Sequence, residues 1–548
     1  MSAGAPPPPA ASAPAGSAAA EKLNTRAAGI VGLAVMCSRV LGLLREQVFA
    51  ALFGGGRVMD AFTVAFRTPN LLRDLFAEGA LSTAFITTFS RTIAREGDGA
   101  AWKLANKIAT LTVVFLSVVV LIGICVAPYL VQLFAPGFDV QKAALTVHLA
   151  RIMYPFIVLV SLAALVMGLL NARNVFGVPA MASSFFNLGS IAGGVIIGWW
   201  LDPHFGAGAL TGLAIGTLIG GAMQLSVQLP ALRRVGYCFH ADFRWRDAGV
   251  RQVLKLMGPS VVAASTTQVN VLINSMFAST LGDGPIFWLS IAFRLMQLPL
   301  GLFGVALGTV TLPLLARVAA VGDLETFRRE LARGMRLAFI LTIPATAGLM
   351  MLAEPIVSTL YQHGRFTAAD AAQAAGALRF YAIGLCGYAA LKVLVNAFYA
   401  VDRRRTPMLV SFIAVAVNLA CNWLFTFHLG WGHRGLAFST GCVATLSFLI
   451  LYGLMHRHLG RLETRALLGT LARVLTATAA LALVCWASDH WLLADWATQR
   501  FVSKLGALLF TVVVGAGVYF TVAVWMRIGD VDEIVAALKR RLARRRGS

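Results

Sequence analysis

The segment TVAFRTPNLL, residues 63–72, decides the fold because a similar segment, SIAFRLMQLP, recurs at residues 290–299. In both copies an arginine follows an Ala-Phe pair, so that Arg67 corresponds to Arg294. Further matches upstream and downstream of the two segments keep almost the same spacing along the chain. Repeated similarity at one spacing is the signature of an internal duplication. We therefore expect two related halves.

The composition places both halves in a membrane. Of the 548 residues, 58% are hydrophobic and 13% are charged, and the mean hydropathy is +0.76. A soluble domain carries about 25% charged residues. Apolar stretches of membrane-spanning length recur along the chain. We expect an all-α polytopic membrane protein of about 14 transmembrane helices, near residues 27–53, 60–90, 108–133, 146–171, 180–201, 206–230, 252–281, 286–316, 334–361, 371–400, 407–428, 434–456, 466–489 and 502–526.

The basic residues predict the orientation. The net charge is +22, and the arginine-rich segments follow the even-numbered spans, as RRR does at residues 403–405. The segments after odd-numbered spans, such as APGFDVQK at residues 135–142, are nearly neutral. Because basic loops stay on the cytoplasmic side, both termini are expected there. Because basic cytoplasmic loops face anionic lipid, the positive charge does not indicate nucleic-acid binding.

The duplication and the span count together predict the domain organisation. Each copy holds an even number of spans, so the two copies have the same orientation and form a parallel repeat. Such pseudo-symmetric six-helix lobes are typical of transporters, with the substrate cavity between them. We divide the chain into a disordered N-terminal tail (1–24), an N-terminal lobe (25–232), a C-terminal lobe (247–458), two additional transmembrane helices (464–527) and a basic cytoplasmic tail (528–548).

Charged residues inside the spans predict a cavity for an anion. A charged side chain at the centre of a membrane helix costs roughly 2.5–3.5 kcal/mol, so it faces a polar cavity rather than lipid. Cations dominate here, and guanidinium groups bind phosphate through two parallel hydrogen bonds. The alternative is that some of these side chains extend to lipid headgroups. The candidates for the cavity are Arg39, Arg45, Arg67, Arg73, Arg294, Asp60, Glu78 and Lys392.

A cation site is a weaker hypothesis. Asn418 and Asn422 are four residues apart on one predicted helix face, and with Gln268 or Asn270 they would offer oxygen atoms to an ion. No acidic residue joins them, so interhelical hydrogen bonding is the favoured interpretation. No catalytic, cofactor or metal-binding motif stands out, so we expect no enzyme. Coupling to Na⁺, to H⁺ or to the membrane potential stays open.

Four segments resemble the MurJ (MviN) lipid II flippases of the multidrug/oligosaccharidyl-lipid/polysaccharide exporter superfamily. They are SRVLGLLRE (38–46), DAFTVAFRTPNLLRDLFAEGALSTAF (60–85), GVALGTVTLPLLAR (304–317) and YQHGRFTAAD (361–370). The resemblance implies a fold of fourteen helices, transfer of the undecaprenyl-diphosphate-linked peptidoglycan precursor between leaflets, and a groove for the lipid tail at the last two spans. The cavity residues that it implies are Arg39, Arg45, Arg73, Arg294 and Asp60.

One departure from the family pattern leaves other functions open. Phe293 and Gln297 stand where the family often carries acidic residues, which removes expected partners of Arg294. The alternatives are a flippase for another polyprenyl-diphosphate-linked glycan such as an O-antigen or exopolysaccharide unit, a drug or cation antiporter, and a membrane-embedded envelope enzyme or scaffold. We expect a monomer in the bacterial plasma (inner) membrane, with lipid II, membrane lipids and the cell-wall synthesis machinery as partners.

Overall fold

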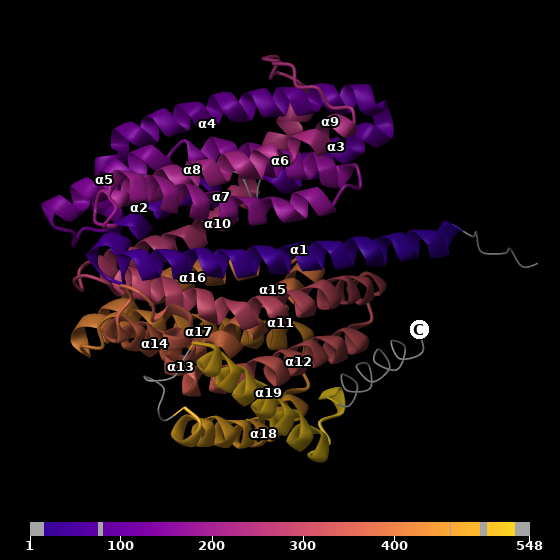
Figure 1. Ribbon diagram of the computed structural model, residues 1–548. Helices are drawn as coiled ribbons and strands as arrows, with labels where there is room; N and C mark the ends of the chain where they lie inside the picture. Colours follow the sequence, from indigo (N-terminus) through magenta and orange to yellow (C-terminus); the bar gives the residue numbers. More distant parts are fainter. Residues whose placement is uncertain (1–15, 75–80, 461, 494–500, 532–548) are drawn as a thin grey trace, which may run out of the picture.

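The protein consists of helices that run mostly side by side (Figure 1). The computed structural model describes residues 16–74, 81–460, 462–493 and 501–531, and every regular element in these ranges is helical. The helices are α1 (Gly16–Phe53), α2 (Arg57–Arg73), α3 (Ser82–Glu96), α4 (Asp98–Phe134), α5 (Val140–Met153), α6 (Phe156–Ala172), α7 (Gly177–Leu201), α8 (Ala209–Ser226), α9 (Leu229–Arg234), α10 (Ala248–Ser279), α11 (Pro285–Val321), α12 (Leu324–Met351), α13 (Ala353–Tyr361), α14 (Ala368–Ile383), α15 (Leu385–Ala400), α16 (Arg405–Trp423), the π-helix η2 (Leu424–His428), α17 (His433–Leu459), α18 (Thr464–Trp491) and α19 (Phe501–Trp525).

The expected membrane fold is confirmed. Among the described residues, ten helices are long and apolar enough to cross a membrane, or eleven if α14 and α15, bent by 41°, form one span. The three expected spans outside this set lie at α1, at α2 with α3, and at α10. Helix α1 carries Arg39, Arg45 and Glu46. Helices with such charges need protein or water beside them rather than lipid alone.

The first helix starts earlier than the sequence suggested. We expected a disordered tail up to residue 24, whereas α1 begins at Gly16. The segment GSAAAEKL at its start is rich in alanine and other strong helix formers, which lets the helix continue beyond the apolar span. The rest of the expected tail, residues 1–15, and most of the expected basic tail, residues 532–548, lie outside the described residues.

The helices form two bundles with α1 between them (Figure 1). The N-terminal bundle comprises α1–α9, in which α1 packs mainly on α7. The C-terminal bundle comprises α10–α17, and its first helix, α10, also contacts α3 and α4 of the other bundle. Helices α18 and α19 pack on each other and on α12, with an apolar core of their own. The junction between the bundles is therefore the place where charged side chains can avoid lipid.

Small residues allow the closest helix contact in the N-terminal bundle. Helices α7 and α8 approach along Gly194, Gly198, Gly212 and Gly216. A Cβ atom added at Gly212 or Gly216 would overlap the backbone of α7. Because apolar side chains gain little from burial against one another in lipid, such close backbone packing is a main source of helix association in membranes. This rigid pair supports α1 and the arginines that α1 carries.

Candidate transport site between the two bundles

The arginines between the bundles lie at two depths. Helix α1 ends, and α2 and α11 begin, at one end of the molecule, which we call the closed end (Figure 1). At a rise of about 1.5 Å per residue, Arg45, Arg67 and Arg294 lie about 10–15 Å from that end. By the same measure Arg39 and Arg73 lie about 20–25 Å from it. Arg73 pairs with Asp74, so we call the other four, Arg39, Arg45, Arg67 and Arg294, the arginine column.

A salt bridge joins the two bundles beside a small chamber. The chamber has a volume of about 70 Å³ and is lined by Arg45, Glu46, Arg294 and several phenylalanine rings. Arg294 Nη2 of α11 lies 2.5 Å from Glu46 Oε1 of α1. The other oxygen of Glu46 accepts a hydrogen bond of 3.3 Å from the buried Tyr361 hydroxyl. Arg294 therefore has a carboxylate partner despite Phe293, and that partner comes from the opposite bundle.

The remaining arginines of the column have few protein partners. The Arg45 guanidinium lies 5.1 Å from the ring centroid of Phe186, and its buried Nε has no protein partner. Arg39 reaches across to α11, where a Cβ atom at Gly301 would overlap its guanidinium. In the described ranges, Arg39, Arg45, Arg67 and Arg294 make one salt bridge, the one with Glu46. The middle of the molecule therefore carries an excess of positive charge.

Arg67 belongs to a second, larger cavity. This cavity has a volume of about 380 Å³ and lies inside the C-terminal bundle, with Arg67 of α2 in its wall. Phe293 and Tyr381 line it and pack against each other, with their ring centroids 5.4 Å apart. Phe293 thus contributes an aromatic wall to this cavity.

The other predicted cavity residues are not all brought to the column. Arg73 pairs with its neighbour Asp74, at 2.9 Å, and Gln268 of α10 donates to the same carboxylate at 3.2 Å. Lys392 is exposed, and the cavity in the C-terminal bundle is lined by its neighbour Leu391 instead. Glu78 lies outside the described residues.

The predicted ion-site residues form a network of neutral amides. Asn422 donates to Asn418 at 3.1 Å and to Asn274 at 2.8 Å, which joins α16 to α10. Gln268 is absent from this network because it binds Asp74, and Asn270 lies in the wall of the larger cavity. Asn422 thus joins the helices through its NH₂ group, whereas the buried oxygens of Asn422 and Asn270 have no hydrogen-bond partner in the described residues.

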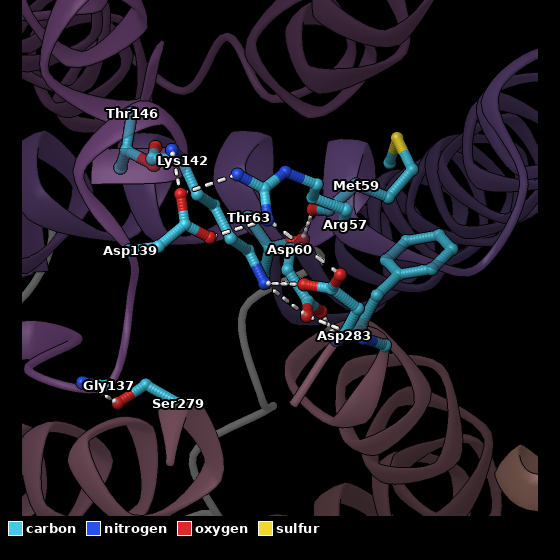
Figure 2. A network of polar contacts seen from close by, with 12 residues as sticks. Arg57, Met59, Asp60, Thr63, Gly137, Asp139, Lys142, Thr146, Ser279 and Asp283 are labelled. Carbon is cyan, nitrogen blue, oxygen red and sulfur yellow. Dashed lines mark hydrogen bonds and ion pairs between the residues drawn. The ribbon is translucent and has the colours of Figure 1, made fainter. Parts of the chain in front are cut away.

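Asp60 belongs to the closed end rather than to the arginine column (Figure 2). Its side chain is fully buried, and its two oxygens accept from the backbone N–H groups of Gly284 and Phe287, at 2.7 and 2.9 Å. These donors belong to the start of α11, where a helix leaves backbone N–H groups without partners. Lys142 of α5 binds the same carboxylate at 3.1 Å. We therefore assign Asp60 to closure of this end and not to substrate contact.

Further contacts between the bundles close the same end. Arg365 of the C-terminal bundle donates to the carbonyls of His204 and Phe205, each at 2.6 Å. Gly137, in the loop after α4, lies so close to the end of α10 that an added Cβ atom would overlap the Ser279 carbonyl. The sequence analysis missed these residues, because a contact between bundles leaves no local pattern. The one sequence feature that could have pointed to Lys142 is Asp60 itself, since a carboxylate within an apolar helix requires a cation partner.

One ion pair at the closed end lies within the N-terminal bundle. Arg57 at the start of α2 donates to both oxygens of Asp139, at 2.5 and 2.6 Å. Asp139 is also the N-cap of α5, where it accepts from the N–H groups of Gln141 and Lys142. The Arg57 guanidinium and these N–H groups hold the pKa of the Asp139 carboxyl well below its usual range.

An apolar groove lies between the C-terminal bundle and α18–α19. It has a volume of about 370 Å³ and is lined by residues that include Pro299, Pro344, Leu481 and Tyr519. The Tyr519 hydroxyl at its wall donates to the Ile340 carbonyl at 2.7 Å, so it is already engaged. Such a surface accepts hydrocarbon and offers little to a polar ligand.

Comparisons with known proteins agree with the resemblance in the sequence. The family model described as lipid II flippase MurJ matches residues 49–506. The lipid II flippase MurJ of Burkholderia cenocepacia is 34% identical over 494 residues, covering 88% of this chain and 94% of the relative. The probable lipid II flippase MurJ of Vibrio cholerae is 33% identical over 510 residues, covering 91% and 95%.

Solved structures show the same fold. A lipid II flippase MurJ in an inward closed conformation has a TM-score of 0.73 and 24% identity, covering 91% of this chain and 98% of that one. An inward-facing multidrug resistance MATE transporter of the MOP superfamily has a TM-score of 0.63 and 15% identity, covering 79% and 95%. The all-helical fold, the arginines between its bundles and the match over most of the sequence lead to one conclusion: this chain is a multi-pass membrane protein of the lipid II flippase MurJ family, whose members are transporters rather than enzymes.

Proposed function

We propose that this protein moves lipid II, the undecaprenyl-diphosphate-linked peptidoglycan precursor, from the cytoplasmic to the outer leaflet by alternating access. The observation that carries the proposal is the excess of arginine between the bundles in a chain of this family. A diphosphate accepts bidentate hydrogen bonds from guanidinium, which keeps its charge in a cavity of low polarity. Arg39, Arg45 and Arg294 are the residues that we assign to the diphosphate.

The apolar groove also supports lipid II as the substrate, because it suits the prenyl tail of the lipid. A long prenyl chain has no polar group to satisfy, and burying each CH₂ group contributes about 0.8 kcal/mol. The groove beside α18 and α19 would hold this tail while the headgroup passes between the bundles. A substrate with both a diphosphate and a long hydrocarbon chain fits the two surfaces together.

We also propose the orientation and the source of energy. The arginine-rich loops support an orientation with both termini in the cytoplasm and the closed end outside. An inside-negative potential then acts on the excess positive charge of the empty cavity, at roughly 2.3 kcal/mol per charge per 100 mV. The neutral amides around Asn422 give no charge for a cation, so we assign the coupling to the potential rather than to Na⁺ or H⁺ at that cluster.

The alternative substrate is another polyprenyl-diphosphate-linked glycan. Its diphosphate would suit the same arginines, and the aromatic wall formed by Phe293 and Tyr381 is the feature of this chain that favours a different headgroup. We expect the protein to act as a monomer, with the cell-wall synthesis machinery as a candidate partner.

The experiment that tests the function uses cells depleted of their own lipid II flippase. This chain is expressed in them, and lipid II in the outer leaflet is measured by its cleavage with an externally added lipid II-degrading toxin. We expect cleavage to be restored by the native chain and lost with Arg294→Ala. Good expression without cleavage would contradict the proposal and direct the test to other polyprenyl-diphosphate-linked glycans.

A further inference from the structure

At the closed end, the buried ammonium group of Lys142 contacts one carboxylate from each bundle. Lys142 Nζ lies 3.1 Å from Asp60 Oδ2 and 2.7 Å from Asp283 Oδ1 (Figure 2). Its side chain is 2% exposed, and it also lies 4.1 Å from the ring centroid of Phe138. Lys142 and Asp60 belong to the N-terminal bundle, whereas Asp283 belongs to the turn before α11. Burying an ammonium group without carboxylate partners is costly, and these contacts supply the partners.

The same site holds the start of α11 by its backbone. Asp60 accepts from the N–H groups of Gly284 and Phe287, which places a carboxylate at the positive end of the α11 dipole. Gly284 has a φ of +108° and lies against the Trp288 ring, which a Cβ atom would overlap. Glycine is therefore required at this turn for both its conformation and its closeness. This close packing holds the N–H groups of the turn in position to bind Asp60.

We propose that Lys142, Asp60 and Asp283, with the first turn of α11, form a charge latch that holds the closed end shut and that must separate for this end to open. These groups lie on both bundles, so any movement of the bundles apart at this end breaks their contacts. Separation exposes the buried charges of Lys142 and Asp60 to water, which offsets the lost contacts. The latch therefore favours closure without making it permanent.

The latch adjoins the small chamber beside Arg45 and Arg294. Phe287, whose N–H binds Asp60, also lines the chamber that contains Arg45 and Arg294. Ser290, one turn further along α11, lines both this chamber and the larger cavity. Opening of the latch would therefore give access from the closed end to the arginines. A thiol placed at Ser290 would report this access.

The test measures labelling of Ser290→Cys by a membrane-impermeant maleimide in spheroplasts. The seven native cysteines are replaced, and the full chain is otherwise unchanged. We expect slow labelling in this background and labelling about tenfold faster with Asp283→Asn, which corresponds to about 1.4 kcal/mol. Lys142→Met should raise labelling at least as much. The experiment needs no substrate, so its result does not depend on the proposed function.

Asp139→Asn is the matched control. Asp139 and Asp283 are loop aspartates of similar side-chain exposure, 51% and 47%, and each binds a cation at the closed end. Asp139 pairs with Arg57 inside one bundle, and an asparagine there still caps α5 and leaves the 3.9 Å contact between Arg57 and Asp283 in place. Its labelling should stay within twofold of the background. An equal rise in the control would show general loosening and would overturn the proposal.

A second variant guards against misfolding. Lys142→Met leaves the Asp60 carboxylate buried without its cation, so the double variant Asp60→Asn, Lys142→Met removes both charges. We expect its labelling to rise as well, because the attraction between bundles is lost while an asparagine oxygen can still accept from Gly284. Unchanged labelling in Asp283→Asn and in the double variant would overturn the latch. A rise confined to inside-out vesicles would support the latch and contradict the proposed orientation.

Discussion

The closed end and the middle of the molecule use charge in opposite ways. At the closed end, two cations, Arg57 and Lys142, meet three carboxylates within short distances. In the middle, four arginines of the described chain share one carboxylate, Glu46. Charges that are paired hold helices together, whereas unpaired cations in a membrane protein are costly and mark a site for a ligand. The difference assigns closure to the closed end and anion binding to the middle of the molecule.

The largest expected effect is in the middle. Arg294→Ala should lower transport about 100-fold, because two charge-assisted hydrogen bonds of about 1.5 kcal/mol each are lost to the diphosphate. Arg294→Lys should keep part of the activity, since the charge remains without the planar fork. Outer-leaflet lipid II measures both. The exposed Lys392→Ala is the control, and an equal loss there would remove the distinction between the column and other cations.

At the closed end the main expected effect is on stability. Lys142→Met should lower the free energy of unfolding by about 3 kcal/mol, because it leaves Asp60 as an uncompensated buried charge. Arg57→Gln removes an ion pair whose side chains are 39% and 51% exposed, and we expect a loss below about 1 kcal/mol. Thermal unfolding of the purified protein compares the two. Equal losses would contradict the assignment of Lys142 as the buried link.

Glu46→Gln sharpens the comparison because it removes the acid that pairs with Arg294. The carboxylate competes with a diphosphate for Arg294, so we expect the affinity for undecaprenyl diphosphate to rise about tenfold, which is about 1.4 kcal/mol. Transport should fall, because Glu46 also bridges the bundles through Tyr361. Affinity is measured by titration of the purified variant. If affinity and transport decreased together, Glu46 would be a positioning residue only.

The smallest effect is expected at Gln297. This residue stands where the family often has an acid, and it is exposed on α11. Because Glu46 already pairs with Arg294, adding a carboxylate by Gln297→Glu should change transport less than about twofold, as surface ion pairs contribute little. The depletion assay measures this. A large gain would show that Arg294 is incompletely paired in this chain.

The sequence predicted the features that depend on local pattern. The repeat around Arg67 and Arg294, the spans and the resemblance to the family led to the helical membrane fold, which the structure confirms. The arginines were found because each is costly in an apolar helix.

Contacts between the bundles were beyond sequence reasoning. The pairing of Glu46 with Arg294 and of Lys142 with Asp283 joins residues far apart in the chain, and no local pattern identifies either partner. The amide cluster shows the same limit. Asn418 and Asn422 were placed together by their helical spacing, but their neighbour on α10 is Asn274 and not Gln268.

The most direct test of the central claim is the affinity of the purified protein for undecaprenyl diphosphate. The native chain is compared with Arg45→Gln and Arg294→Gln from the middle, and with Arg57→Gln from the closed end. The account predicts that each middle variant weakens binding at least about tenfold, or about 1.4 kcal/mol, and that Arg57→Gln leaves it unchanged. Equal weakening by all three, or unchanged binding in the middle variants, would contradict the division between unpaired and paired charge.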